Sequence, residues 1–84
     1  MIKVLYFATL REQLHCDSEH LELDPELIDL AALTARLCQR GGVWEEALGG
    51  GQSVLTAVNA EIAGPRTRLG DGDEVAFFPP VTGG

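Results

Sequence analysis

The last two residues of the sequence, Gly83 and Gly84, form a pair without side chains. Lacking Cβ atoms, two consecutive glycines make a thin segment that can pass close to other protein surfaces. The terminal carboxylate is then the only functional group at the tip. Residues 79–84 (PPVTGG) reach at most about 20 Å when fully extended, which is long enough to enter the active site of another protein.

A carboxylate is a poor electrophile, so it must be activated before it can carry a transferable group. An ATP-dependent partner could convert it into an acyl-adenylate, and sulfur could then displace AMP to leave a thiocarboxylate. Neither step needs a catalytic side chain from this chain, whose sequence shows no nucleophile–base pair, metal-ligand cluster or phosphate-binding loop. We therefore expect no metal and no permanently bound cofactor, only a transient acyl-adenylate for which the partner uses ATP.

A frayed chain end is the alternative interpretation of the two glycines. At the average glycine frequency of about 7%, a Gly-Gly ending arises by chance in roughly one chain in two hundred. The preceding residues favour a functional tail, because Pro79 and Pro80 directly follow a strand-like segment. Proline has no backbone N–H and fixes φ, so these two residues end the strand and give the chain an extended exit. We predict a folded domain over residues 1–78 and an extended tail over residues 79–84.

The strands that must hold this tail follow from the apolar pattern. Residues 2–8 (IKVLYFA), 54–59 (VLTAVN) and 74–78 (EVAFF) are rich in β-branched and aromatic residues, which is typical of strands. Residues 19–23 (EHLEL) alternate between charged and apolar residues, which predicts a strand with one wet face. Asn59 can begin a turn, and Asp71-Gly72 is a strong turn signal before the last strand.

The main predicted helix begins after Asp29, which can cap it, and runs to about Gln39. Asp24 before Pro25 is an alternative cap. Residues 9–14 and 44–48 suit shorter helical turns. The apolar stripe of the main helix comprises Leu30, Leu33 and Leu37. The element order strand, strand, helix, strand, strand indicates an α+β fold in which one main helix packs across a mixed sheet.

Two strands are expected to expose apolar side chains. Lys3 prefers solvent, so the alternation of a strand also places Leu5 and Phe7 on the outer face of the sheet. If Glu74 is solvated, Phe78 lies on that face as well. Ile62 could extend the apolar surface. Such a surface indicates a protein-binding patch, unless a helix or loop covers the face and makes these residues ordinary core.

Charge and cysteine content restrict the partners and the compartment. The formal net charge of −7 over 84 residues disfavours binding to nucleic acid or to an anionic membrane surface and favours a partner with a basic surface, although it can also serve solubility alone. Cys16 and Cys38 lack the spacing of a redox or zinc motif, so reduced thiols are expected. With no signal-peptide pattern and no apolar run of about 20 residues, we expect a cytoplasmic protein.

The segment 72–84 (GDEVAFFPPVTGG) resembles the ending of the molybdopterin synthase small subunits, a family of ubiquitin-like sulfur carriers. Residues 2–8 (IKVLYFA), Leu10-Arg11-Glu12 and Ala57-Val58-Asn59 resemble the same family. The resemblance spans the whole chain, but residues 17–51 match mainly in pattern. The glycine-rich residues 49–51 depart from the family pattern, which we interpret as a tolerated variation of a surface loop.

The resemblance implies a β-grasp fold and a role in molybdenum cofactor biosynthesis. An adenylating, E1-like enzyme would activate Gly84, a sulfur donor would convert it to a thiocarboxylate, and Gly83 would give clearance in the tunnel of the large catalytic subunit. There the sulfur would pass to cyclic pyranopterin monophosphate to form the dithiolene, within a heterotetramer of two small and two large subunits. The resemblance assigns docking on the large subunit to Phe7, Ile62 and Phe78, with Arg11 at the rim and Pro79, Pro80, Val81 and Thr82 leading into the tunnel.

Three other functions remain open at this stage. A sulfur carrier for thiamine or tRNA thiolation, and a ubiquitin-like protein modifier, would share the fold and the Gly-Gly ending. The domain could also be a plain β-grasp interaction module whose tail is inert. The context Phe77-Phe78-Pro79-Pro80-Val81-Thr82 favours the molybdopterin branch, in which the chain is a non-catalytic, sulfur-donating subunit.

Overall fold

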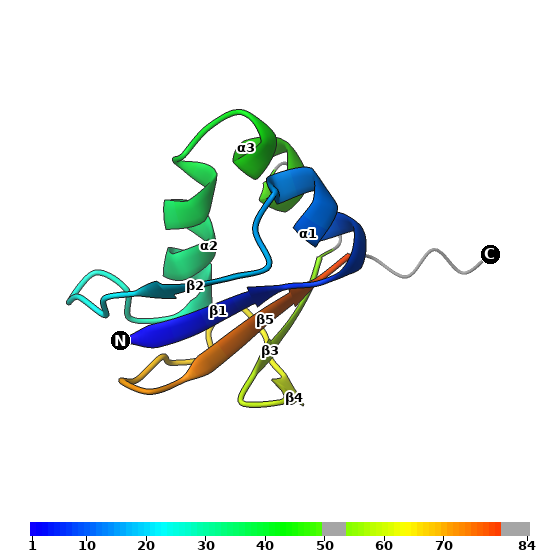
Figure 1. Ribbon diagram of the computed structural model, residues 1–84. Helices are drawn as coiled ribbons and strands as arrows, with labels where there is room; N and C mark the ends of the chain where they lie inside the picture. Colours follow the sequence, from blue (N-terminus) through cyan, green and yellow to red (C-terminus); the bar gives the residue numbers. More distant parts are fainter. Residues whose placement is uncertain (50–53, 80–84) are drawn as a thin grey trace.

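The computed structural model of the chain describes residues 1–49 and 54–79. The strands and helices agree in place with most of the predicted segments (Figure 1). In chain order they are β1 (Ile2–Tyr6), α1 (Ala8–Leu14), β2 (Ser18–Leu21), α2 (Leu30–Cys38), α3 (Val43–Leu48), β3 (Leu55–Val58), β4 (Glu61–Ile62) and β5 (Glu74–Phe78).

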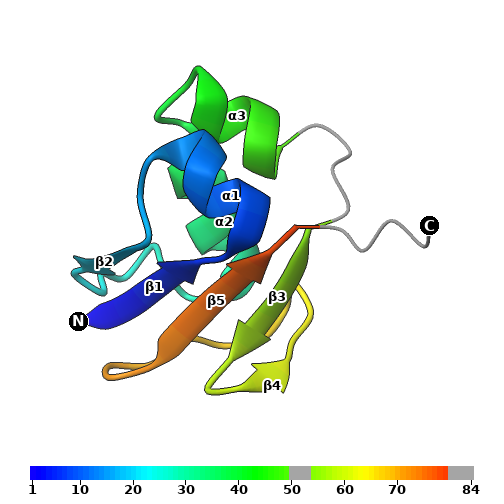
Figure 2. The ribbon, with the colours of Figure 1, turned by 45° about the vertical axis from the view of Figure 1, so that its right-hand side comes forward.

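The strands form one mixed sheet in the order β2-β1-β5-β3-β4 (Figure 2). The first and last strands, β1 and β5, are neighbours and run parallel, with Tyr6 opposite Phe77. The other neighbouring pairs are antiparallel. Parallel strands end at the same edge of a sheet. Phe7, the residue after β1, therefore lies beside the end of β5. The end of β5, after which the predicted tail begins, therefore lies beside the end of the N-terminal strand.

The three helices of the described residues lie on one side of the sheet, here called the inner face (Figure 1). Tyr6 and Phe77 are almost fully buried there, and their rings stack with centroids 5.8 Å apart. The core beneath the helices is built from side chains of alternate strand positions and of the α2 stripe. Its most buried members are Ile2, Val4, Tyr6, Leu27, Leu30, Leu33, Leu37, Val75 and Phe77. The alternation predicted for β1 and β5 is therefore observed.

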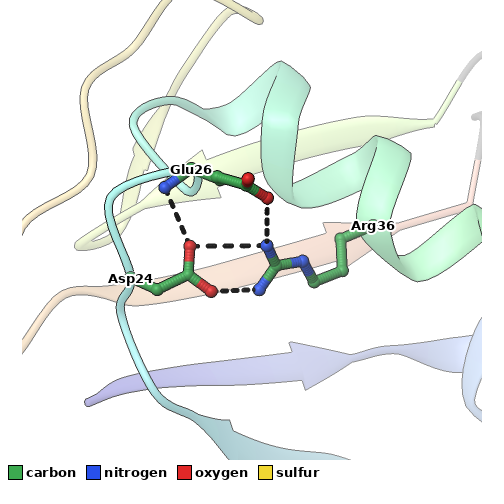
Figure 3. A network of polar contacts seen from close by, with 3 residues as sticks. All are labelled: Asp24, Glu26 and Arg36. Atoms are coloured by element: carbon green, nitrogen blue, oxygen red, sulfur yellow. Dashed lines mark hydrogen bonds and ion pairs between the residues drawn. The ribbon is translucent and has the colours of Figure 1, made fainter.

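Helix α2 begins as predicted, with Asp29 as its N-cap. The Asp29 Oδ1 atom accepts a hydrogen bond from the Ala32 N–H at 2.8 Å, which satisfies one donor of the first helical turn. Asp24 is not the cap. Its carboxylate accepts from the Glu26 N–H at 2.8 Å and from the Arg36 guanidinium at 2.5 and 3.3 Å (Figure 3). These bonds attach the segment before the helix to the body of α2.

The sequence interpretation missed strand β4. This strand has only two residues and lies at the edge of the sheet, paired with β3 through Ala57–Ile62 and Val58–Glu61. Two residues are too few to produce an apolar alternation, so no pattern could indicate it. Asn59 begins the turn as expected, with φ of +50°. The segments predicted as helical turns form two short helices, α1 and α3, beside the main helix α2.

None of the helices within residues 1–49 and 54–79 is long and apolar enough to cross a membrane.

Candidate functional site

The candidate site is the sheet face opposite the helices. Residues paired across a sheet ladder point to the same side, and the pairs Leu5–Ala76, Leu55–Phe78 and Ala57–Ile62 all belong to this outer face. Five apolar side chains that are not fully buried gather here with Phe7, which follows β1. We call this set the outer patch: Leu5, Phe7, Leu55, Ile62, Ala76 and Phe78.

The centre of the outer patch is a pair of stacked phenylalanines. The Phe7 and Phe78 rings are parallel to within 5°, with centroids 4.7 Å apart. The Phe7 N–H donates to the Phe77 carbonyl at 3.1 Å, which continues the β1–β5 pairing by one residue beyond β1. Phe7 is 38% exposed and Phe78 is half-buried. The two rings therefore support each other while leaving apolar surface open to solvent.

Two further members of the outer patch lie on the other side of Phe78. Leu55 on β3 is 42% exposed and Ile62 on β4 is 73% exposed. Helices α1, α2 and α3 all pack on the inner face, so no described helix covers these side chains (Figure 2). A continuous exposed apolar surface on a small domain is typical of a protein-docking site. The outer patch lies at the end of β5, where the chain leads into residues 79–84.

Arg11 lies one helical turn beyond Phe7. Ala8 adopts a left-handed conformation, with φ of +52°, and turns the chain from β1 into α1. The Phe7 carbonyl then accepts from the N–H groups of Leu10 and Arg11 at 3.1 and 3.4 Å. Arg11 is exposed, and its backbone is bonded to that of Phe7 in the outer patch.

On the inner face, polar side chains connect the sheet to the helices. The Tyr6 hydroxyl donates to Glu19 Oε2 at 2.8 Å, and Arg40 donates to both Glu19 carboxylate oxygens at 2.9 and 2.7 Å. The Arg40 guanidinium also lies 4.4 Å above the Trp44 ring centroid. Burial and the bond to Glu19 raise the pKa of Tyr6, while the bonds from Arg40 lower the pKa of Glu19. This network stabilises the layer beneath the site.

A groove of about 440 Å³ lies between α2, the end of α3 and β3. Its described lining is mainly apolar, and the two hydroxyls in that lining are already engaged: Thr34 donates to the Leu30 carbonyl and Thr56 to the Ala63 carbonyl. Its thiol, Cys38, is free, and burial raises the pKa of that thiol. A raised pKa reduces the thiolate fraction, so Cys38 has the character of a structural thiol. The same holds for Cys16, whose pKa is also raised by burial.

Among residues 1–49 and 54–79, no group of three or more metal-ligating side chains is close enough to hold a metal ion.

Of the residues to which the resemblance gives a docking role, the structure stacks Phe7 on Phe78. Ile62 lies on the same face of the sheet, two strands away from Phe78 on β4. Pro79 directly follows β5 and is half-buried. Five of the predicted site residues lie outside the described part of the chain: Pro80, Val81, Thr82, Gly83 and Gly84.

Sequence reasoning missed Leu55 as a member of the outer patch. The segment 54–59 contains no charged residue that would mark its wet face. Only the pairing with Phe78, whose side was predicted, could have indicated the orientation of Leu55. That pairing depends on the register of two strands far apart in the sequence.

Comparison with known proteins assigns the family. The chain matches the ThiS family over residues 4–84. It is 43% identical over 84 residues to the molybdopterin synthase sulfur carrier subunit of Escherichia coli (strain K12), and 38% identical over 84 residues to the subunit of that name from Haemophilus influenzae. Both alignments cover 100% of each chain.

A solved structure gives the same result for the fold. The complex of subunits 1 and 2 of the molybdopterin-converting factor from Helicobacter pylori 26695 contains a chain that matches with a TM-score of 0.68 and 28% identity. The match covers 99% of this chain and 97% of that chain. The mixed sheet, the helices on one face and these matches show that the chain is a β-grasp, ubiquitin-like protein that belongs to the ThiS family.

Proposed function

We propose that the chain is the sulfur-carrier small subunit of a molybdopterin synthase, with Gly84 as the residue that carries the sulfur. The observation that carries this proposal is the position of the outer patch, which surrounds the end of β5 where the chain continues into residues 79–84. A partner docked on the Phe7–Phe78 stack would receive those residues directly. The full-length relatives named as molybdopterin synthase sulfur carrier subunits support the same function.

The chemistry proceeds at the terminal carboxyl group. A carboxylate oxygen of Gly84 attacks the α-phosphorus of ATP on an adenylating enzyme, and pyrophosphate leaves. A donor sulfur at the oxidation level of sulfide then attacks the acyl carbon, the bond to the AMP oxygen breaks, and AMP leaves. The thiocarboxylate sulfur attacks a carbon of cyclic pyranopterin monophosphate on the large subunit, and the bond from that carbon to an oxygen substituent breaks as the oxygen leaves. Water then cleaves the acyl–sulfur bond, which restores the carboxylate and leaves the sulfur on the pterin. The folded domain supplies docking and positioning.

The partners follow from this sequence of steps. They are the large catalytic subunit, an E1-like adenylating enzyme and a sulfur donor, all acting in the cytoplasm, with two small and two large subunits in the assembled synthase. The net charge of −7 favours basic docking surfaces on these partners. The solved complex of subunits 1 and 2 of the Helicobacter pylori converting factor supports the large subunit as a partner.

Intact-mass analysis tests the proposal directly. The chain is incubated with ATP, the adenylating enzyme of the same pathway and a sulfur source, and we expect one oxygen to be replaced by one sulfur at the C-terminus. A variant that lacks Gly83 and Gly84 is the matched control and should stay unmodified while docking on the large subunit. Failure of the full chain to acquire sulfur in the presence of active enzyme would contradict the carrier function.

Capture experiments separate the remaining alternatives. Stable binding to the molybdopterin synthase large subunit supports the proposal, whereas activity only with a thiamine or tRNA thiolation system would assign another sulfur-carrier pathway. An isopeptide adduct on a lysine of another protein would assign a modifier. An interaction module with an inert tail would keep its full function without Gly83 and Gly84.

A further inference from the structure

The hairpin that carries Ile62 is short, with four residues in β3 and two in β4. Strands β3 and β4 are joined by the two-residue turn Asn59-Ala60, whose φ angles are +50° and +68°, and Val58 pairs with Glu61 to close it. Two successive left-handed residues suit a tight turn between twisted strands, and asparagine is favoured at the first position. A two-residue edge strand has little stability of its own. Other contacts must therefore hold Ile62 in place.

Asn59 supplies such contacts through both its backbone and its side chain. Its N–H donates to the Glu74 carbonyl at 2.8 Å, and its Oδ1 accepts from the Glu74 N–H at 3.0 Å. Its Nδ2 donates to Asp73 Oδ1 at 3.0 Å. The other Asp73 oxygen accepts from the Gly70 N–H at 2.7 Å, which fixes that carboxylate. One side chain thus attaches the β3–β4 turn to the beginning of β5.

The opposite end of the hairpin is held by Thr56. Its hydroxyl donates to the Ala63 carbonyl at 2.8 Å, and its backbone carbonyl accepts from the Ala63 N–H at 2.9 Å. Ile62 lies between these two attachments. The Ile62 side chain is 73% exposed, so packing against other residues does little to hold it in place. Its position therefore depends on the geometry of the hairpin.

We infer that Asn59 is a positioning residue for docking: it fixes the β3–β4 hairpin in the register that presents Ile62 on the outer patch to the large subunit. The register matters because a slip of one residue moves a side chain to the other face of the sheet. Asn59 itself lies at the turn, bonded to the start of β5, and is not a member of the outer patch. Its effect on docking is therefore exerted through Ile62. The inference rests on the proposed function for its docking partner, while its structural part stands independently.

The structural part is tested on the free protein with two substitutions. Asn59→Gly removes the side-chain hydrogen bonds but still adopts the left-handed conformation readily. Asn59→Ala removes the same hydrogen bonds and also disfavours the left-handed conformation. We expect amide hydrogen exchange at Ala63 and Glu74 to become roughly tenfold faster in Asn59→Gly, as the loss of two hydrogen bonds implies. The NMR signals of the Ile62 methyl groups should shift. Unchanged Ala63 exchange together with unshifted Ile62 signals would overturn the inference.

The functional part is tested by a double-mutant cycle on binding to the large subunit. Asn59→Gly should weaken binding about fivefold when Ile62 is present and less than about twofold in an Ile62→Ala background, because a residue that acts through Ile62 has no effect without it. In a Leu55→Ala background the fivefold loss should persist. Equal losses in all three backgrounds would show a general effect on stability and overturn the inference. If the unmodified chain does not bind the large subunit, the proposed function fails, and the exchange result still decides whether Asn59 positions Ile62.

Discussion

The rings of Phe7 and Phe78 are stacked with centroids 4.7 Å apart and planes 5° from parallel. One residue follows the first strand and the other ends the last strand, and the parallel pairing of β1 with β5 brings them together. The stack joins the part of the chain that leads into residues 79–84 to the part that enters α1. A partner that contacts this stack therefore contacts the exit of the proposed tail.

Phe78→Ala is expected to weaken binding to the large subunit much more than it weakens the fold. Truncation of an aromatic side chain at the centre of a docking site typically costs about 2 kcal/mol or more of binding free energy. Phe78 is half-buried outside the inner core, so we expect the free energy of unfolding to fall by about 1 kcal/mol. Calorimetric titration and urea denaturation measure the two quantities.

The adjacent residue provides the matched control. Phe77 points to the inner face and is 1% exposed, so Phe77→Ala should lower the free energy of unfolding by about 3–5 kcal/mol. If Phe78→Ala instead destabilised the protein as much as Phe77→Ala and left binding intact, Phe78 would be a core residue and the outer patch would not be the docking surface.

Leu55→Asp is expected to weaken docking, although no pattern in the sequence pointed to this residue. The substitution places a carboxylate in the apolar outer patch, next to Phe78, and desolvation of that charge on binding should cost about 1–3 kcal/mol. Ile28→Asp is the control, because Ile28 is similarly exposed but lies before α2, outside the outer patch. Equal effects of the two substitutions on the dissociation constant would indicate non-specific electrostatics.

One alanine added after Gly84 is expected to abolish sulfur transfer. The added residue displaces the reactive carbon by about 3.5 Å, which is far more than a positioned reaction tolerates. Docking through the outer patch should remain within about twofold of that of the unmodified chain, because the extended chain keeps every side chain of the outer patch. Single-turnover transfer assays and binding measurements separate the two steps. Full transfer activity in the extended chain would refute the tail mechanism.

Much of the fold could be predicted because single residues mark the faces of the strands. Lys3 and Glu74 identify the wet side of β1 and β5, and the structure pairs them opposite each other. Asp29 identified the start of α2 because a capping side chain acts within three residues of itself. Local signals of this kind are present in the sequence.

What could not be predicted depends on contacts between distant segments. Strand β4 has no pattern of its own, and the place of Leu55 in the outer patch depends on the register of β3 against β5. The Asn59 side chain bonds to Asp73 and Glu74 only after the two segments meet. The sequence suggested Asn59 only as a turn residue, and its role in holding the hairpin required the structure.

Glu19→Gln is expected to remove one pH-dependent contribution to stability. The Glu19 carboxylate is mostly buried and accepts bonds from Arg40 and Tyr6, and the Arg40 bonds hold the pKa of Glu19 below its ordinary value of 4.5. A carboxyl group whose pKa is lower in the folded state stabilises the fold above its unfolded pKa. That contribution disappears as the pH falls through the folded pKa.

At pH 7 we therefore expect Glu19→Gln to lower the free energy of unfolding by about 1 kcal/mol, since the amide still accepts a hydrogen bond but carries no charge. The difference between the two proteins should shrink as the pH falls below about 4.5 and through the folded pKa of Glu19. Below the folded pKa, Glu19 is protonated in both the folded and the unfolded chains, so its charge no longer contributes to stability. Asp24 and Asp71 also have lowered pKa values, but they are present in both proteins and cancel in the difference. Urea denaturation of both proteins between pH 7 and pH 3 measures the difference in their free energies of unfolding. A difference that stays constant or grows as the pH falls would show that the Glu19 charge does not stabilise the helical layer.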